Sequence, residues 1–518
     1  MRIFSKASDH FVIFAFLLII FIPGIGMFLG KKAEEVRVLL NREPYQLPPI
    51  NIKKIGRTDF KGIENWFVDR ALFITSLSKF WSNVVYKLGT SIKPGQAILG
   101  KEEWLFLGND YAASIDQYTG KNKPTEEEIL LKLSVLKQMN DLARQNNIPF
   151  LVAIAPDKQE IYPEYLPNNI HKGSSKNRLE LLQEAMLANG IDFVNLKQKE
   201  IEAKNILGKQ YGDLYLKGDS HWNYLGAYAA YQAISDYMLK KGLQSRRLQF
   251  NFIRRQTTYS DLTNFLQLTH IKSNNPLPDV SNLKIDLFGR DIAGKETKLT
   301  DFQGNPNGVI LVAPYENINK AIKNKQTCLL IGDSFSESLS FYFHNDFYNT
   351  VRIHSGNTSW NLSDLIQKYH PDLIVYEKVE RDLLYPLVNF QITAHQVNFP
   401  KIPKQAFAVN GQIDKFKIEP DKITVQGWAY IPGLDAGKGE VYLKLATGSQ
   451  TYFYSMNKIQ KQSVSLAFKQ DGNHLDLAGF SGTILRKDLS AGTYEVSLVV
   501  VNDNVTGEMK LPNTYMLG

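Results

Sequence analysis

Two short motifs hold the residue types of an acyl-transfer site, and Ser334 lies in the first. An apolar run leads into Ile331-Gly332-Asp333-Ser334-Phe335, and helical character follows. A strand, a tight turn and a helix would place Ser334 at the helix start, on the carboxyl edge of an α/β sheet. Free N–H groups and a partial positive charge there suit a developing oxyanion. A second interpretation, in which Asp333 or Ser334 is only a helix cap, stays open from this motif alone.

The second motif is Gly218-Asp219-Ser220-His221-Trp222-Asn223, followed by a predicted helix that Asn223 would cap. In extended backbone Asp219 and His221 point to the same side. The carboxylate can then hold one imidazole nitrogen while the other faces a hydroxyl, as a Ser-His-Asp triad requires. The alternative is a surface turn. One His and one Asp are too few ligands for zinc, so we predict neither a metal nor a cofactor.

The elements around these motifs alternate between helix and strand. Ile148–Ala155, Thr327–Ile331 and Asp372–Tyr376 are apolar runs typical of strands covered on both faces, and Asn177–Ala188 is an amphipathic helix. Helix and strand in alternation predict an α/β fold with a parallel sheet and crossover helices.

The organisation of the chain follows from breaks in this pattern. We predict a catalytic domain over 59–400, with an insertion at about 245–325 of irregular structure and short strands to which we assign no chemistry. Alternating segments without helical period predict an all-β sandwich over 405–518, a candidate carbohydrate-binding domain. Trp428 is expected to pack between its sheets.

The N-terminus contains an uncharged apolar run, Phe11–Gly30. Its length of about 20 residues suffices to cross a bilayer core. No small-residue cleavage site follows, so an uncleaved signal-anchor over 1–31 is favoured over a removed signal peptide, with a linker over 32–58. We therefore expect a transmembrane helix and a membrane-anchored protein.

Composition excludes several classes of protein. Among 518 residues, 60 Lys and Arg stand against 52 Asp and Glu, a net charge of +8. This charge is too weak to argue for a nucleic-acid partner. The single cysteine, Cys328, excludes an intrachain disulfide framework and is expected to be an inert core residue.

Taken together, the motifs resemble the SGNH hydrolase-like domain of the alginate O-acetyltransferase family, the AlgX/AlgJ type. The segments that carry this resemblance are Ile98–Leu107, Ala155–Pro167, Asp219–Trp222 (DSHW), Gly332–Phe335 (GDSF) and Tyr376–Arg381. In ordinary SGNH hydrolases the serine block comes first. Here the order is reversed, as in the alginate-type family, which is similar to a circular permutation.

The resemblance implies an SGNH-like (flavodoxin-like) fold, with Ser334 as nucleophile, His221 as general base and Asp219 as the carboxylate that orients it. It also implies an extracytoplasmic enzyme, in the periplasm or at the cell surface, that moves acetyl groups onto polysaccharide hydroxyls. A membrane O-acyltransferase would supply the acetyl donor. The Ser334 backbone N–H is the first candidate for the oxyanion hole, and Asn357 is the second.

Other polar residues are weaker candidates. Trp222, Lys158, Tyr162 and Arg381 are candidate substrate-binding residues. The simpler interpretation is a partly buried core position for Trp222, and a structural ion pair or an exposed position for each of the other three. Glu377 and Glu380 could form a glycosidase pair, an interpretation that we rank below the triad.

Two alternatives to the transferase stay open. A carbohydrate acetyl-esterase would use the same triad with water as the acceptor. A non-catalytic polysaccharide-binding or assembly scaffold would not need all three triad residues.

Overall fold

The computed structural model describes most of the chain beyond residue 44. The described residues are 45–49, 56–70, 74–299 apart from 244, 259, 269 and 292, 315–356, 360–385, 407–517 apart from 449, and single positions 13, 14, 16, 17, 21, 390, 391, 393, 394, 396 and 397. Most of the predicted anchor and linker, and Asn357, lie outside them. Within the described part, no helix combines the length and the apolar character that crossing a membrane requires.

An eight-stranded sheet forms the centre of the molecule, in the order β10-β9-β11-β13-β12-β15-β3-β4. Its parallel part consists of β13 (Asn349–His354), β12 (Thr327–Gly332), β15 (Leu373–Val379), β3 (Phe150–Ala155) and β4 (Phe193–Asn195). Every residue of β12, β15 and β3 is buried. This confirms the predicted parallel strands, and it leaves their carboxyl ends at one common edge.

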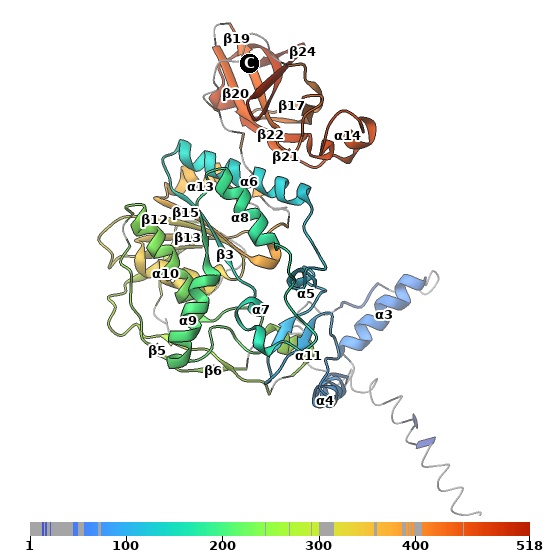
Figure 1. Cartoon of the computed structure of the whole chain (residues 1–518), viewed down its shortest axis with the longest axis vertical. Helices are drawn as coiled ribbons and strands as arrows, with labels where there is room; N and C mark the ends of the chain where they lie inside the picture. The colour runs from blue at the N-terminus through green and yellow to red at the C-terminus, as the bar shows by residue number, and fades with distance from the viewer. Residues whose placement is uncertain are drawn as a thin grey trace, which may run out of the picture.

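Helices cover both faces of this sheet, and alternate strand residues point to each. One face packs against α9 (Leu196–Tyr211), α10 (Tyr224–Lys240) and α12 (Ser336–Asp346). The other packs against α6 (Glu126–Gln145), α8 (Arg178–Ala188) and α13 (Leu362–Tyr369). Figure 1 shows α6 and α8 on the side nearer the C-terminal sheets, and α9 and α10 on the opposite side. Cys328 is buried in the first core, as predicted.

The region predicted as an irregular insertion contributes to this sheet. Its strands β9 (Leu287–Arg290), β10 (Glu296–Lys298) and β11 (Tyr315–Asn319) pair antiparallel, and β11 joins the sheet beside β13. The sheet is therefore mixed rather than wholly parallel. These strands are too short to show a clear alternation of apolar and polar residues, so pairing with β13 rather than local pattern makes them part of the sheet.

The C-terminal region forms two antiparallel sheets that share one core. Their orders are β17-β18-β22-β21 and β20-β19-β23-β24. The strands are β17 (Asn410–Ile418), β18 (Lys422–Tyr430), β19 (Glu440–Thr447), β20 (Gln450–Ser455), β21 (Asn457–Ile459), β22 (Gly479–Leu485), β23 (Gly492–Asn502) and β24 (Val505–Leu517). Val425, Phe480, Leu443 and Leu498 lie in the shared core.

Trp428 does not lie in that shared core, contrary to our expectation. It is half-buried in a smaller cluster, with its ring 5.2 Å from that of Phe468, which follows the short helix α14 (Gln462–Ala467). The reason is strand parity, because Val425 faces the other sheet and Trp428 therefore points to the opposite face.

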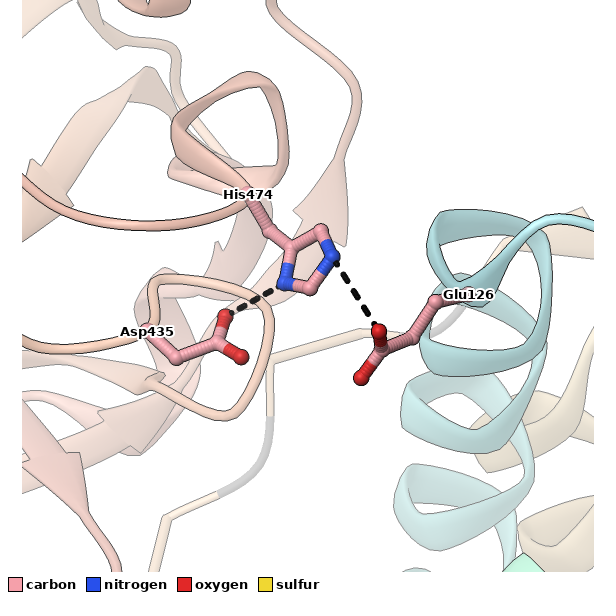
Figure 2. Close-up of side chains that lie close together, drawn as sticks. All are labelled: Glu126, Asp435 and His474. Carbon is pink, nitrogen blue, oxygen red and sulfur yellow. Dashed lines mark hydrogen bonds and ion pairs between the residues drawn. The ribbon is translucent and has the colours of Figure 1, made fainter. Parts of the chain in front are cut away.

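The C-terminal sheets contact α6 at several points. Lys137 pairs with Glu440, and the Gln138 side chain donates to the Met456 carbonyl at 3.1 Å. At the start of α6, Glu126 faces His474, whose Nδ1 lies 2.8 Å from the Asp435 carboxylate (Figure 2).

Candidate active site

Ser334 lies in the turn between β12 and α12, at the carboxyl edge of the parallel strands. Gly332 ends β12 where space is tight: a Cβ there would lie 2.5 Å from Glu377 Oε2 and 2.6 Å from Ser336 Cβ. Only glycine fits this approach without a shift of its neighbours. The strand–turn–helix geometry predicted for this motif is present.

Asp333, rather than Ser334, holds this turn in place. Its Oδ1 accepts the Phe335 N–H at 2.9 Å, and its Oδ2 accepts the Val379 N–H at 2.9 Å at the end of β15. Asp333 is buried, and burial acts to raise its pKa, but nearby Lys378 and these N–H groups outweigh it and keep the pKa below the usual value. The carboxylate thus fixes the turn before α12, and the Ser334 hydroxyl is left for another partner.

That partner is His221, and a continuous chain of contacts reaches Asp219. His221 Nε2 lies 2.7 Å from Ser334 Oγ. His221 Nδ1 lies 2.6 Å from Asp219 Oδ1, which also accepts the His221 backbone N–H at 3.0 Å. The two motifs, more than a hundred residues apart in sequence, form a Ser–His–Asp arrangement with the spacing that proton transfer requires.

Electrostatics favours a protonated imidazole in this arrangement. Burial alone would lower the pKa of His221, but the Asp219 carboxylate outweighs burial and raises it above 6.5. Burial likewise opposes ionisation of Asp219, yet His221 and two backbone N–H groups lower the pKa of that carboxyl to about 2. Asp219 is therefore ionised at neutral pH and stabilises the imidazolium that forms when His221 takes a proton.

Lys158 is a buried ammonium beneath the Asp219 loop. Its Nζ donates to the carbonyl oxygens of Leu216 at 3.0 Å, Lys217 at 3.1 Å and Asp219 at 2.5 Å. Its burial lowers its pKa to about 7. With 2 % of its surface exposed, Lys158 fixes the loop and does not present its charge to a substrate.

Trp222 and Tyr162 are also buried. The Trp222 indole N–H donates to the Phe335 carbonyl at 3.0 Å, which links the two motifs directly. The Tyr162 hydroxyl accepts the Leu214 N–H at 2.9 Å. These contacts favour positioning over the substrate-binding role for which both residues were candidates, because a buried ring cannot stack on a polymer.

Arg381 is buried as well, at the end of β15. Its guanidinium pairs with Asp157 Oδ1 at 2.5 Å and lies over the Phe335 ring, 5.3 Å from its centroid. The ion pair is charge-assisted and shielded from solvent, so it fixes the turn after β15 beside the Ser334 turn. As with Trp222, its burial favours a positioning role.

Glu377 and Glu380 do not resemble a glycosidase pair. Both are buried, and desolvation, followed by neighbouring carboxylates, raises each pKa well above 4.5. The Glu377 oxygens accept no hydrogen bond within the described part of the chain. Because both carboxyls resist ionisation, they do not fit a pair that requires one ionised partner.

The Ser334 backbone N–H precedes the first turn of α12, where N–H groups have no acceptor within the helix. It stays our candidate oxyanion donor. Asn357, the second candidate, lies outside the described residues.

Sequence reasoning missed Asp261. It begins the short helix α11 (Asp261–Leu266), inside the region to which we assigned no chemistry. Its backbone N–H donates to Asp219 Oδ2 at 2.8 Å, and its Oδ2 lies 3.7 Å from His221 Nδ1. No motif in the sequence marks it, because about 40 residues separate it from Asp219.

Comparisons with known proteins show which family this chain resembles. A family described as "SGNH hydrolase-like domain, acetyltransferase AlgX" matches residues 97–299. Over residues 97–299 the chain is similar to SGNH hydrolase-like acetyltransferases of the AlgX/AlgJ type. The matched segment contains Asp219, His221 and Asp261, and Ser334 lies beyond its end.

The curated proteins that this chain matches are distant from it in sequence. "Probable alginate O-acetylase AlgJ" of Pseudomonas putida is 23% identical over 327 residues, which cover 58% of this chain and 74% of the relative. The protein of the same name from Pseudomonas syringae is 26% identical over 231 residues, covering 43% of this chain and 55% of that protein. The chain thus matches about half of the second relative's length.

The solved structures that this chain matches include the following three. The O-acetyltransferase domain of Pseudomonas putida AlgJ matches 56% of this chain and 92% of that chain, with 20% identity and a TM-score of 0.35. Bacillus cereus PatB1 matches 55% and 96%, with 15% identity and a TM-score of 0.42. Pseudomonas aeruginosa AlgX matches 78% and 94%, with 11% identity and a TM-score of 0.34.

Proposed function

We propose that this protein is an extracytoplasmic polysaccharide O-acetyltransferase that carries the acetyl group on Ser334. The observation that carries the proposal is the chain of contacts from Asp219 through His221 to Ser334, with Nε2 of the imidazole 2.7 Å from the hydroxyl oxygen. An alcohol becomes a useful nucleophile only when a base takes its proton as it attacks.

In the first half-reaction, Ser334 Oγ attacks the carbonyl carbon of an acetyl donor. His221 Nε2 takes the hydroxyl proton, and the negative oxygen of the tetrahedral intermediate faces the Ser334 N–H. When the intermediate collapses, the bond to the leaving group breaks and His221 returns the proton to it. The product is an acetyl ester of Ser334.

In the second half-reaction, a sugar hydroxyl attacks the acetyl-Ser334 carbonyl while His221 takes its proton. The Ser334–acetyl bond breaks, the proton returns to Ser334 Oγ, and the sugar leaves as its acetate. His221 is neutral before each attack and protonated after it, so Asp219 stabilises both tetrahedral intermediates through the same imidazolium.

We further propose that the protein is anchored in a membrane and that a membrane O-acyltransferase supplies its acetyl groups. The support is the uncharged run Phe11–Gly30 in the sequence and the family that the chain resembles. The acceptor that we propose is a polysaccharide, since the curated relatives are named for alginate. The C-terminal sheets are a candidate site for holding that polymer.

The test compares the full-length protein with its Ser334→Ala variant, using p-nitrophenyl acetate as donor and an oligosaccharide as acceptor. We expect wild type to yield acetylated oligosaccharide and an acetylated Ser334 peptide by mass spectrometry. The variant should lose about 10³-fold or more of the rate. The control is Ser338→Ala, a half-buried serine on the same helix, which should behave as wild type.

Two outcomes would contradict the proposal. Ser334-dependent release of p-nitrophenol without acetylated sugar would make the protein an esterase. Equal inertness of wild type and variant, with oligosaccharide binding retained, would make it a scaffold.

A further inference from the structure

Asp261 and the Asp219–His221 loop hold each other by reciprocal hydrogen bonds. The Asp261 backbone N–H donates to Asp219 Oδ2 at 2.8 Å. In return, the Ser220 backbone N–H donates to Asp261 Oδ1 at 2.8 Å, and the Ser220 hydroxyl donates to Asp261 Oδ2. Each side of this contact supplies one carboxylate and one backbone donor, so neither can shift without breaking bonds on both.

The backbone around this contact is packed closely enough to fix it. The Thr263 N–H donates to the Gly218 carbonyl at 3.1 Å. A Cβ on Gly218 would lie 2.5 Å from Thr263 Cγ2, so only glycine allows the two segments to come this close. The start of α11 therefore packs firmly against the loop that carries His221 and holds it in place.

The Asp261 carboxylate also brings a second negative charge to the imidazole. Its Oδ2 lies 3.7 Å from His221 Nδ1. Asp219 Oδ1 lies closer to the same nitrogen, at 2.6 Å. At this distance the carboxylate is too far for a hydrogen bond but close enough for a substantial charge interaction. The side chain is 24% exposed, so solvent screens this interaction only in part.

We propose that Asp261 is a positioning residue of the Ser334 site, which fixes the Asp219–His221 loop and stabilises the His221 imidazolium with a second carboxylate. This inference rests on the proposed function, because it assigns His221 the role of general base. It goes beyond that function by adding a fourth residue from a region outside both motifs.

The charge state of Asp261 is consistent with this role. Burial, together with the neighbouring Asp219 carboxylate, raises the pKa of Asp261 to about 6. Asp261 is therefore mostly ionised at pH 7 and above, the range in which His221, with its raised pKa, can act as a base. Three other charged groups interact with this cluster among the described residues. The charge of Arg381 lowers the pKa of His221, and Lys158 interacts with both carboxylates. Glu337 on α12 also interacts with His221.

The test is the pH dependence of kcat/KM for p-nitrophenyl acetate, measured on the full-length protein and its Asp261→Asn variant. Asparagine keeps an oxygen to accept the Ser220 N–H but removes the charge. We expect the acid limb of the profile to move down by about one pH unit, and the plateau to fall about tenfold, because the imidazolium loses a stabilising charge. Asp279→Asn, the same change at a half-buried position away from His221, should leave the profile unchanged.

A purely structural role would give a different result. The variant would then lose activity or melting temperature while its acid limb stays at the wild-type pH, and that result would overturn the proposal. Nuclear magnetic resonance titration of the His221 ring separates this from failure of the proposed function. If wild type shows no Ser334-dependent turnover, a lower His221 pKa in Asp261→Asn still supports the inference, and an unchanged pKa rejects it.

Discussion

At the residue scale, the site depends on which hydrogen-bond partner each polar side chain has. Both carboxylate oxygens of Asp333 accept backbone N–H groups, and the Ser334 hydroxyl contacts His221. Asp219 occupies the other imidazole nitrogen and fixes the tautomer. The chemistry follows from this division, because the Ser334 hydroxyl can donate its proton to His221 while a lone pair on its oxygen stays free to attack an acyl carbon.

The raised pKa of His221 predicts the acid limb of activity. Turnover requires the neutral imidazole, and the Asp219 carboxylate outweighs burial and holds the pKa above 6.5. We therefore expect kcat/KM to fall as pH decreases, with its inflection above pH 6.5, in a profile measured with p-nitrophenyl acetate. An inflection at or below pH 6.5 would show that Asp219 does not control the base.

The same pKa has a consequence for stability. A folded pKa above the unfolded value means that the His221–Asp219 pair stabilises the folded protein fully below about pH 6.5. That contribution is lost as pH rises through the folded pKa. Asp219, with a folded pKa of about 2, stabilises above its unfolded pKa and loses that contribution only as pH falls toward about 2.

Gly332→Ala tests the tight approach beneath the nucleophile. The new Cβ would lie 2.5 Å from Glu377 Oε2 and 2.6 Å from Ser336 Cβ, so β12 and the start of α12 must separate. We expect a loss of about 1–3 kcal/mol in the free energy of unfolding and slower acylation of Ser334. Gly356→Ala, whose Cβ would meet only His354 at 3.6 Å, should melt like wild type. Equal melting temperatures for all three proteins would argue against the close approach.

At the element scale, the site exists because strand ends and helix starts converge on one sheet edge. β12 delivers Ser334, and the loop before α10 delivers Asp219 and His221. Asn223 caps α10, as predicted, by accepting the Leu225 and Gly226 N–H groups at 2.9 and 3.2 Å. His221 therefore lies two residues before Asn223, the N-cap that fixes the start of α10.

Asn223→Ala should accordingly weaken both stability and catalysis. Its side chain also donates to the Asp213 carbonyl at 2.6 Å, so the loop loses bonds on two sides. We expect a cost of about 1–2 kcal/mol in unfolding and a lower kcat. Asn361→Ala is the matched control, since Asn361 caps α13 on the other face of the sheet. We expect both variants to lose stability, but only Asn223→Ala to lose kcat. Equal kcat values in the two variants would contradict the prediction.

At the scale of the whole molecule, the C-terminal sheets meet the catalytic domain along α6. Figure 2 shows His474 between Asp435 of the C-terminal region and Glu126 at the helix start. Burial would lower the pKa of His474, but its hydrogen bond to Asp435 and the charges of Asp435, Glu126 and Glu127 outweigh it and raise the pKa above 6.5. The part of this contact that His474 makes is therefore stronger when the imidazole is protonated.

We expect this contact to loosen as pH rises. A raised folded pKa means that the stabilisation is present below about pH 6.5 and is lost as pH increases through the folded value. Hydrogen exchange in the first turn of α6, corrected for the intrinsic rate, should show less protection at high pH. His474→Gln should remove this pH dependence, while His171→Gln at an exposed position should keep it. Equal protection across the pH range in wild type would contradict the prediction.

Much of the fold and the core of the site could be predicted from the sequence. Long apolar runs mark β3, β12 and β15, because strands buried on both faces need side chains that exclude water everywhere. Ser334, His221 and Asp219 lie in motifs whose local residue types already indicate their chemistry. The family resemblance stated from these motifs is confirmed by the match over residues 97–299.

Tertiary structure decided the rest, for reasons of distance and burial. Whether Lys158 or Trp222 faces a substrate or the core depends on what covers it, and no local pattern records that. Asp261 became part of the site only because α11 packs against the Gly218 loop. The sequence determined which groups could react. Packing between segments far apart along the chain determined which of them meet, since contacts between such segments leave no periodic trace in either one.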